Sequence, residues 1–395
     1  MRIKLLYLYT IISVTMQSII RTDLNLFFRE IGLTNGDIGN ITSAQLWGAA
    51  CLGLLVSIFA DILGRKRMLI ASIIFFPLGN LGLLLAGNMN TMLLFSFIQG
   101  GFSVVSFTVI QAMLVDITTP KERAKVIGIN LGLMMGVGVF GNFFAGVLGT
   151  WFGLKNALLF AIIGYLFAII PVIMIKDDFK GGSIHSVFDF SGFTKEAKIL
   201  VFLHFMTTLT VGFGAGLFIH FGNLIFKDLF NMTTLGIGIA LSIAQVGTAF
   251  SNFFTHRLGR VIGPFRFKLI TQALVVPLII AMAFVRQPIV FIIIYAMRFV
   301  LMNSGNPIRT TIINSYVPSD KISTIAGLNS LINNSVRAVA ALLFGYIVGA
   351  SVEGYTTLFL ISAVFYGINV LIAIVMYRQY ENDPKVKELY NHKTA

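Results

Sequence analysis

Among the ionisable residues within apolar stretches of this 395-residue chain, five stand out: Arg21, Asp23, Arg298, Arg309 and Arg337. A charged side chain in hydrocarbon is unfavourable unless it faces a cavity or a partner, so such residues are functional candidates. Four of the five are arginines, and guanidinium groups bind carboxylates and phosphates in a bidentate manner. This surplus of cations predicts that a small organic anion contacts these side chains.

Two sets of polar residues share helical faces with these arginines. Gln17, Arg21 and Asn25 recur at steps of four, which predicts one polar stripe along a helix. We interpret this stripe as part of a substrate-binding surface.

The second set lies around residue 300. Arg298 and Arg309 are 11 residues apart, close to three helical turns, and the separation along the axis is about 16 Å. Asn303 adds polarity between them, and all three residues are predicted to contact substrate. The pair Asn306-Pro307 is expected to interrupt the helix and free a backbone carbonyl.

Proton transfer has three candidate groups. Asp23 is two residues from Arg21, so on a straight helix it points elsewhere. It either pairs with an arginine of a neighbouring helix or binds and releases a proton. His204 and His220 are rival proton carriers, because histidine titrates near neutral pH.

The composition indicates a membrane protein. Hydrophobic residues make up 56% of the chain and charged residues 11%, with a mean hydropathy of +0.87. A soluble domain carries about 25% charged residues, so this chain needs a surface that faces lipid. The net charge of +13 fits a cytoplasmic face rich in Lys and Arg better than nucleic-acid binding.

Several function classes lack their sequence signals. The single cysteine, Cys51, forms no intrachain disulfide and no metal cluster. There is no phosphate-binding loop for an ATP-driven pump and no nucleophile with a base beside it. We therefore expect no enzyme activity, no metal and no cofactor.

Twelve segments are long and apolar enough to cross a membrane, and they predict an all-α polytopic protein. The first is interpreted as a permanent span and not as a signal peptide. The spans are predicted at 6–30, 37–60, 67–87, 91–115, 123–150, 154–175, 199–226, 233–256, 267–285, 288–315, 322–349 and 355–378. A polar interruption divides the chain into an N-terminal six-helix bundle (1–176), a linker (177–198), a C-terminal six-helix bundle (199–378) and a tail (379–395).

The distribution of Lys and Arg predicts the orientation. With the N-terminus inside, the termini and inside loops hold 21 of the 29 basic residues, whereas the outside loops hold four. Both termini are therefore predicted to be cytoplasmic in a cell (plasma or inner) membrane. The inside set includes Arg65, Lys66, Arg67, Lys121, Arg123, Lys125, Arg257, Arg260, Arg266 and Lys268.

The two halves of the chain resemble each other. Residues 60–65 (ADILGR) and 255–260 (THRLGR) follow the second and eighth spans at an offset of 195. Pro120 and Pro318 follow the fourth and tenth spans at an offset of 198. Matching loops at nearly one offset predict two pseudo-symmetric bundles related by a parallel repeat. For Arg337 two roles stay open, an ion pair between the halves and contact with substrate.

The loop between the second and third spans carries a family signature. Residues 57–69 read SIFADILGRKRML, which resembles the pattern GxLaDrxGrkxxL of the major facilitator superfamily. This resemblance implies a conformational latch between the halves at Asp61, Gly64, Arg65 and Arg67. The segment after the fourth span also resembles the family and implies that Asp116 and Arg123 join that latch.

The resemblance covers the whole chain and implies the twelve-helix fold of this family. It implies alternating access, a small-molecule substrate, a cavity lined by the first, fourth, seventh and tenth spans, and function as a monomer within the bilayer. Two departures weaken an assignment to drug–proton antiporters. Ser96 stands where those proteins carry an Arg before Gln99-Gly100, and residues 141–146 (GNFFAG) lack the Pro of their GPxxGG motif.

Three functions compete at this point. The first is a secondary transporter, with proton coupling, for a small organic anion. The second is a multidrug or amphipathic-lipid exporter, with which the Phe-rich and Met-rich spans are compatible. The third is a membrane sensor or scaffold without transport, which the absence of a long signalling segment disfavours.

Overall fold

The computed structural model describes residues 2–175, 192–318 and 321–390, and within them every regular element is helical. Contacts group these helices into two compact units. Unit 1 consists of Met1–His185, His220–Ile243 and Ala341–Ala350, and unit 2 consists of Ser186–Ile219, Ala244–Ala340 and Ser351–Ala395. The seventh, eighth and eleventh predicted spans are therefore divided between the units. The predicted boundaries of the two halves and the linker remain a prediction.

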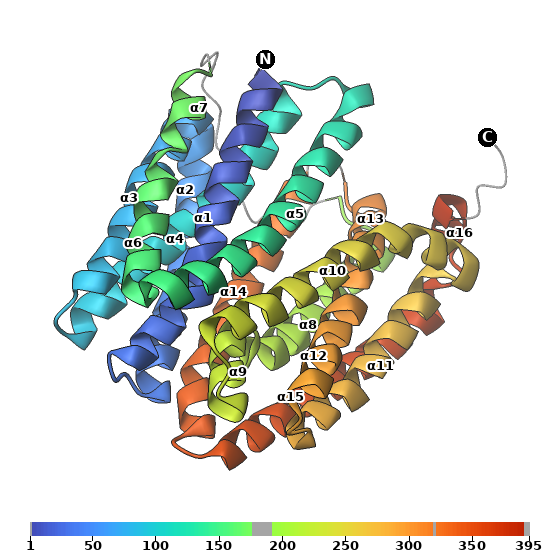
Figure 1. The fold of residues 1–395 in the computed structure, drawn as a ribbon. Coiled ribbons are helices and arrows are strands. Elements are labelled where there is room, and N and C mark those ends of the chain that lie inside the picture. Colours follow the sequence, from blue (N-terminus) through green and yellow to red (C-terminus); the bar gives the residue numbers. More distant parts are fainter. Residues whose placement is uncertain (1, 176–191, 319–320, 391–395) are drawn as a thin grey trace. The chain divides into compact units, whose positions relative to one another are not determined.

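Unit 1 holds the first six predicted spans. Figure 1 shows α1 beside α5 and α6, and α1 contacts both helices. The helices are α1 (Arg2–Glu30), α2 (Asn35–Leu63), α3 (Arg65–Leu85), α4 (Met89–Asp116), α5 (Pro120–Phe152), α6 (Leu154–Leu166) and α7 (Ile169–Ile173). The unit also holds α9 (Gly222–Phe230), the first turns of α10 (Thr234–Ile262) and the last turns of α14 (Ile322–Val348).

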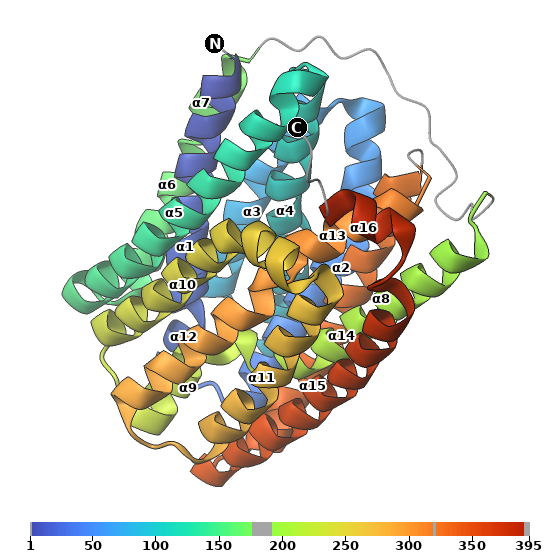
Figure 2. The same cartoon turned by 90° about the vertical axis from the view of Figure 1, so that its right-hand side faces the viewer.

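Unit 2 holds the rest of α10 and α14 together with six further helices. Figure 2 shows α11 running along α15, and these two helices share many contacts. The additional helices are α8 (Lys195–Gly216), α11 (Pro264–Phe284), α12 (Pro288–Ser304), α13 (Asn306–Tyr316), α15 (Val352–Tyr380) and α16 (Pro384–Tyr390).

The predicted fold class is confirmed. All twelve predicted spans fall on helices, and eleven helical segments of the described residues are long and apolar enough to cross a membrane. The remaining span corresponds to α2, a helix of 29 residues. The predicted interruption near Asn306-Pro307 is present as well, because α12 ends at Ser304 and α13 begins at Asn306.

The repeat is more regular in the structure than in the sequence. Helices α10 and α11 begin and end 199 residues after α2 and α3, from Asn35 to Thr234 and from Leu85 to Phe284. Gly64 and Gly263 connect the two helices of each pair, with φ of +106° and +98°. Residues other than Gly rarely adopt such backbone angles. The offset of 195 predicted for this loop is therefore wrong, since it pairs Gly64 with Gly259, one helical turn too early.

Glycine allows α2 and α4 to pack closely in unit 1. A Cβ at Gly100 would overlap the carbonyl oxygen of Gln45, and a Cβ at Gly48 would overlap that of Phe97. The glycines of α5 differ in this respect. A Cβ at Gly141 would stand 2.6 Å from Cβ of Ser18. A Cβ at Gly132 or Gly136 would meet no described atom within 4 Å.

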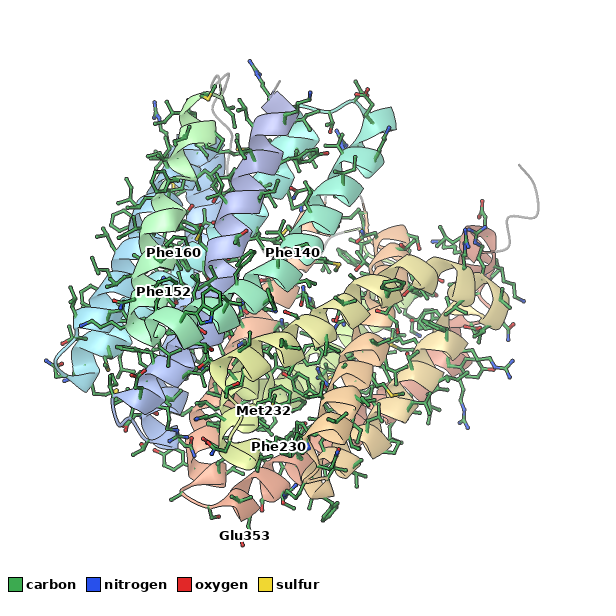
Figure 3. All side chains as sticks on the ribbon, viewed as in Figure 1. Phe140, Phe152, Phe160, Phe230, Met232 and Glu353 are labelled. Atoms are coloured by element: carbon green, nitrogen blue, oxygen red, sulfur yellow. The ribbon has the colours of Figure 1, made fainter. Side chains whose placement is uncertain are left out.

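Large apolar side chains cover the outside of the helices. Phe140 and Phe152 of α5 and Phe160 of α6 are more than half exposed, and Figure 3 shows them pointing away from their helices. A surface of this kind is stable against lipid tails and unfavourable in water. It agrees with the low content of charged residues.

Candidate functional site

The polar stripe of α1 lies in unit 1, and its three members have different environments. Nε2 of Gln17 donates to the Tyr165 hydroxyl at 3.3 Å. Nδ2 of Asn25, which is buried, donates to the carbonyl oxygen of His220 at 2.8 Å. Arg21, between them, is exposed and makes no ion pair with a described residue. Its guanidinium is thus the member of the stripe that is available to an anion.

Asp23 lies on another side of α1 and is completely buried, with 0% of its surface exposed. Neither carboxyl oxygen has a hydrogen-bond partner among the described residues. The carboxyl borders α5, because a Cβ added at Gly149 would stand 3.4 Å from Oδ2 and 2.8 Å from Cγ2 of Thr234. The ion pair with an arginine that the sequence allowed is absent from the described part of the chain.

A hydrogen-bonded network inside unit 1 was not predicted from the sequence. The Tyr9 hydroxyl donates to Oγ of Ser106 at 2.9 Å, and this oxygen lies 2.7 Å from the Tyr165 hydroxyl. Tyr9, Ser106 and Gln17 line one small cavity. Tyrosines and a serine of separate helices leave no local spacing signal, so only the tertiary structure identifies the network.

Polar contacts gather where α1 ends and α2 begins. Nη2 of Arg29 lies 2.8 Å from Oδ2 of Asp228 in α9, and the same nitrogen bonds Asn35. Nδ2 of Asn35 in turn donates to the carbonyl oxygen of Gly349 at 2.8 Å. Nδ2 of Asn223 donates to the carbonyl oxygen of Thr22 at 2.7 Å. These contacts join α1, α2, α9 and the end of α14.

Asn142 is one of the two departures from the drug-antiporter pattern, and it has a structural contact in unit 1. It stands where that pattern has proline, and its Oδ1 accepts a hydrogen bond from Oγ1 of Thr22 at 3.1 Å. Ser96, at the position of the expected arginine, is buried and donates to the carbonyl oxygen of Ile41 at 2.7 Å. Both residues therefore contribute to helix packing within unit 1.

The predicted latch residues lie around the turn between α2 and α3. Arg65 forms an ion pair with Asp116 and donates to the carbonyl oxygen of Ala112 at 2.7 Å. Gly64 makes the turn with its positive φ. These contacts join α3 to α4 within unit 1.

The other latch residues contribute less to this arrangement. Nη2 of Arg123 donates to the carbonyl oxygen of Val115 at 3.3 Å, and Arg67 is exposed. The side chain of Asp61 lies outside the described residues. The role of all these positions as a latch stays a prediction.

Arg298 is enclosed within unit 2 and only 1% exposed. It bonds the Tyr366 hydroxyl, and its guanidinium carbon lies 4.9 Å from the ring centroids of Phe218 and Phe299 and 5.3 Å from that of Tyr366. Aromatic faces stabilise a guanidinium through their quadrupoles. Aromatic side chains thus form much of the surroundings of the Arg298 guanidinium.

The remaining candidates occupy different places. Arg309 is half-buried on α13, and His204 is buried on α8. Asn303 donates to the carbonyl oxygen of Phe299 at 2.9 Å. Arg337 lies on α14, and its Cα would stand 2.9 Å from a Cβ at Gly216. His220 belongs to unit 1, where its carbonyl oxygen accepts the bond from Asn25.

Lys268 was expected in an inside loop, and this placement is wrong. It lies in the second turn of α11 and is 2% exposed. The helix begins at Pro264, three residues before the predicted span, because Gly263 provides the turn and proline is favoured at a helix start. Nearby, Oε2 of Glu381 accepts the backbone N–H of Phe265 at 2.9 Å. Burial raises the pKa of the Glu381 carboxyl.

Known proteins resemble this chain along most of its length. The sequence matches the Major Facilitator Superfamily over residues 6–341. It is 24% identical over 347 residues to Quinolone resistance protein NorA of Staphylococcus aureus (strain COL), which covers 84% of this chain and 85% of that protein. It is 26% identical over 239 residues to Multidrug resistance protein 2 of Bacillus subtilis (strain 168), covering 56% of this chain and 57% of that protein.

Two solved structures share the fold. A bacterial homologue of the human lysosomal transporter Spinster, in an inward-facing and occupied conformation, gives a TM-score of 0.79 at 14% identity and covers 96% of both chains. The nucleoside transporter NupG gives a TM-score of 0.75 at 13% identity and covers 95% of this chain and 99% of that one. The chain belongs to the Major Facilitator Superfamily and is a multi-pass membrane transporter, not an enzyme.

Proposed function

We propose that this chain is a secondary active transporter that works by alternating access and couples a small organic solute to protons through Asp23. The main support for proton coupling is that the Asp23 carboxyl is buried without a hydrogen-bond partner among the described residues. We place the transporter in the plasma membrane with both termini in the cytoplasm, in accordance with its distribution of Lys and Arg.

The physical argument rests on desolvation. An ionised carboxylate without a partner is strongly unfavourable in an apolar interior, whereas the neutral acid is tolerated. The environment of Asp23 therefore favours a bound proton in this conformation. The Asp23 carboxyl lies beside Gly149 of α5, and Thr234 of α10 borders the same glycine. A rearrangement of α5 and α10 would therefore expose the carboxyl to water and release the proton. A group that alternates in this way carries one proton in each cycle.

The solute is proposed to carry a negative charge that contacts Arg21. This arginine is exposed, lies four residues from both Gln17 and Asn25, and has no carboxylate partner in the described part of the chain. A guanidinium without a counter-ion is suited to a carboxylate or phosphate. Arg298 is less suited because aromatic rings enclose it.

The alternative, export of drugs or amphipathic lipids, is favoured by the names of two relatives. They are a quinolone resistance protein and a multidrug resistance protein. A quinolone is an aromatic compound with a carboxylate group, so this drug class meets the requirements of both candidates. It is the first solute to test.

The test is transport in proteoliposomes with an imposed pH gradient. The solutes are a fluorescent quinolone, its methyl ester, and the cationic dye ethidium. The wild-type protein is expected to move the quinolone faster with the gradient than without it, and to move the ester poorly. Asp23→Asn is expected to abolish the response to the gradient while exchange of labelled for unlabelled solute continues.

Two variants complete the test. Glu30→Gln removes an exposed carboxylate from the same helix and should leave the response to the gradient intact. Arg21→Gln should raise the KM for the quinolone and have little effect on the ester. A full response to the gradient in Asp23→Asn would refute the coupling role. Preference for the ester or ethidium would refute the anionic solute.

A further inference from the structure

Unit 2 holds a group of basic residues that have no part in the proposed proton coupling. Lys268 of α11 is 2% exposed and His204 of α8 is 6% exposed. Arg309 of α13 lines the same cavity as Lys268, together with Leu200, Phe265, Ile308, Ile312, Ile313 and Met376. His204 lies on α8 one helical turn after Leu200, which lines this cavity. We call these three residues the Lys268 cluster.

Among the described residues, the Lys268 cluster lacks a counter-ion. Nζ of Lys268 has one hydrogen-bond partner in the described residues, the thioether sulfur of Met376 at 3.3 Å, and a thioether is a weak acceptor. Nδ1 of His204 and Nε of Arg309 are buried without a hydrogen-bond partner among these residues. No described carboxylate lies within ion-pair distance of Lys268 or Arg309.

The surroundings of the cluster are apolar, which makes uncompensated charge unfavourable. Phe265, Ile308, Ile312, Ile313 and Met376 belong to a hydrophobic core that packs α8, α11, α13 and α15 together. The stem of Lys268 lies beside the break between α12 and α13, where its Cγ would stand 3.7 Å from a Cβ at Gly305. Two cations close together in such a core repel each other unless an anion neutralises them.

The internal repeat shows that the fold itself does not require these charges. At the offset of 199 residues that relates α3 to α11 and the start of α4 to that of α12, Lys268 corresponds to Leu69 and Arg309 to Ile110. Leu69 is 0% exposed and Ile110 is 2% exposed. The same architecture in unit 1 is thus stable with buried aliphatic side chains at both positions. The charges of unit 2 call for a reason other than packing.

We propose that the Lys268 cluster is a binding site for an oxyanion, either a carboxylate or a phosphate. The ammonium group supplies a point charge, the guanidinium supplies paired N–H donors, and the imidazole supplies a further polar atom. The anion belongs either to a small solute or to the headgroup of a lipid. The site is independent of Asp23, and it holds whether or not the transporter is coupled to protons.

The experiment measures thermal unfolding of the purified full chain in detergent. One arm titrates sodium phosphate and sodium benzoate at constant ionic strength. The other arm adds phosphatidylglycerol or the neutral lipid phosphatidylcholine to the micelles. A site occupied by a solute predicts that the soluble anions raise the unfolding temperature with saturation. A site occupied by a lipid predicts that phosphatidylglycerol raises it and phosphatidylcholine does not.

The variants assign the effect to the cluster. Lys268→Leu is expected to unfold at a higher temperature than the wild type without anion, because it removes an uncompensated buried charge, and to lose the response to anions. Arg309→Gln should lose the response as well. Arg266→Leu removes an exposed charge from the same helix, two residues away, and should keep it.

Two results would overturn the assignment of an anion site. The proposal is wrong if neither soluble anions nor phosphatidylglycerol stabilise the wild type. It is also wrong if Lys268→Leu and Arg309→Gln keep the full shift. Should Lys268→Leu fail to fold, Arg309→Gln decides alone, since its half-buried side chain is replaced by a polar one. Asp23→Asn should keep the anion response, which separates this test from that of proton coupling.

Discussion

The carboxyl group of Asp23 lies against Gly149, so close that a Cβ added to the glycine would stand 3.4 Å from Oδ2. Gly149 offers no side chain to the carboxyl, and neither carboxyl oxygen is hydrogen-bonded among the described residues. The acid of α1 is thus held between helices in a place that disfavours its charged form. This relationship connects the packing of unit 1 to the proposed movement of protons.

The ion pair of Arg29 and Asp228 should stabilise unit 1 by a modest amount. Both side chains are partly exposed, at 29% and 21%, and pairs of this kind contribute about 0.2–1 kcal/mol. Arg29→Ala and Asp228→Ala should each lower the unfolding temperature. The double variant should lose less than the sum of the two, in a double-mutant cycle. Lys227→Ala, on the same helix, is the control. Strict additivity would show that the pair contributes nothing.

Two glycines of unit 1 should respond to alanine in opposite ways. Gly100→Ala places a methyl group on the carbonyl oxygen of Gln45, and overpacking of this kind destabilises a protein by about 1–3 kcal/mol. Gly132→Ala meets no described atom within 4 Å and should stabilise α5 by about 0.5–1 kcal/mol. Unfolding in detergent measures both. Equal effects would contradict the close packing of α2 on α4.

Tyr366 should be important for the stability of unit 2, because it is a hydrogen-bond partner of the enclosed Arg298. Tyr366→Phe preserves the ring but leaves a buried guanidinium without this acceptor. Such a loss destabilises a protein by about 1–3 kcal/mol. The matched control is Tyr346→Phe, at a tyrosine that is 77% exposed. If the two variants unfold at the same temperature, Arg298 depends on its aromatic neighbours alone.

The length of the apolar runs was sufficient to predict the membrane spans, and all twelve predicted spans fall on helices. Helical periodicity added the faces of these helices. It also predicted that Asp23 and Arg21 point in different directions, because residues two apart in a helix do not share a face. It misplaced Lys268 in a loop because a lysine at a predicted helix end resembles an anchoring residue. The turn at Gly263 decides this placement, and its positive φ appears only in the structure.

The contacts of the candidate residues could not be predicted, because they join helices far apart in the sequence. Arg298 and Arg309 share a predicted face, but the aromatic enclosure of Arg298 depends on Phe218 and Tyr366. The network of Tyr9, Ser106 and Tyr165 likewise comes from three helices. A single sequence does not show whether a buried polar residue faces a cavity or a neighbouring side chain.

The most direct test of proton coupling through Asp23 is the protonation state of this carboxyl, measured without any knowledge of the solute. Infrared difference spectra of the purified protein between neutral and alkaline pH report protonated carboxyl groups through their carbonyl-stretch band. Proton coupling through Asp23 predicts such a band at neutral pH in the wild type and in Glu30→Gln, and its loss in Asp23→Asn. The same band in Asp23→Asn, or no band in the wild type, would contradict it.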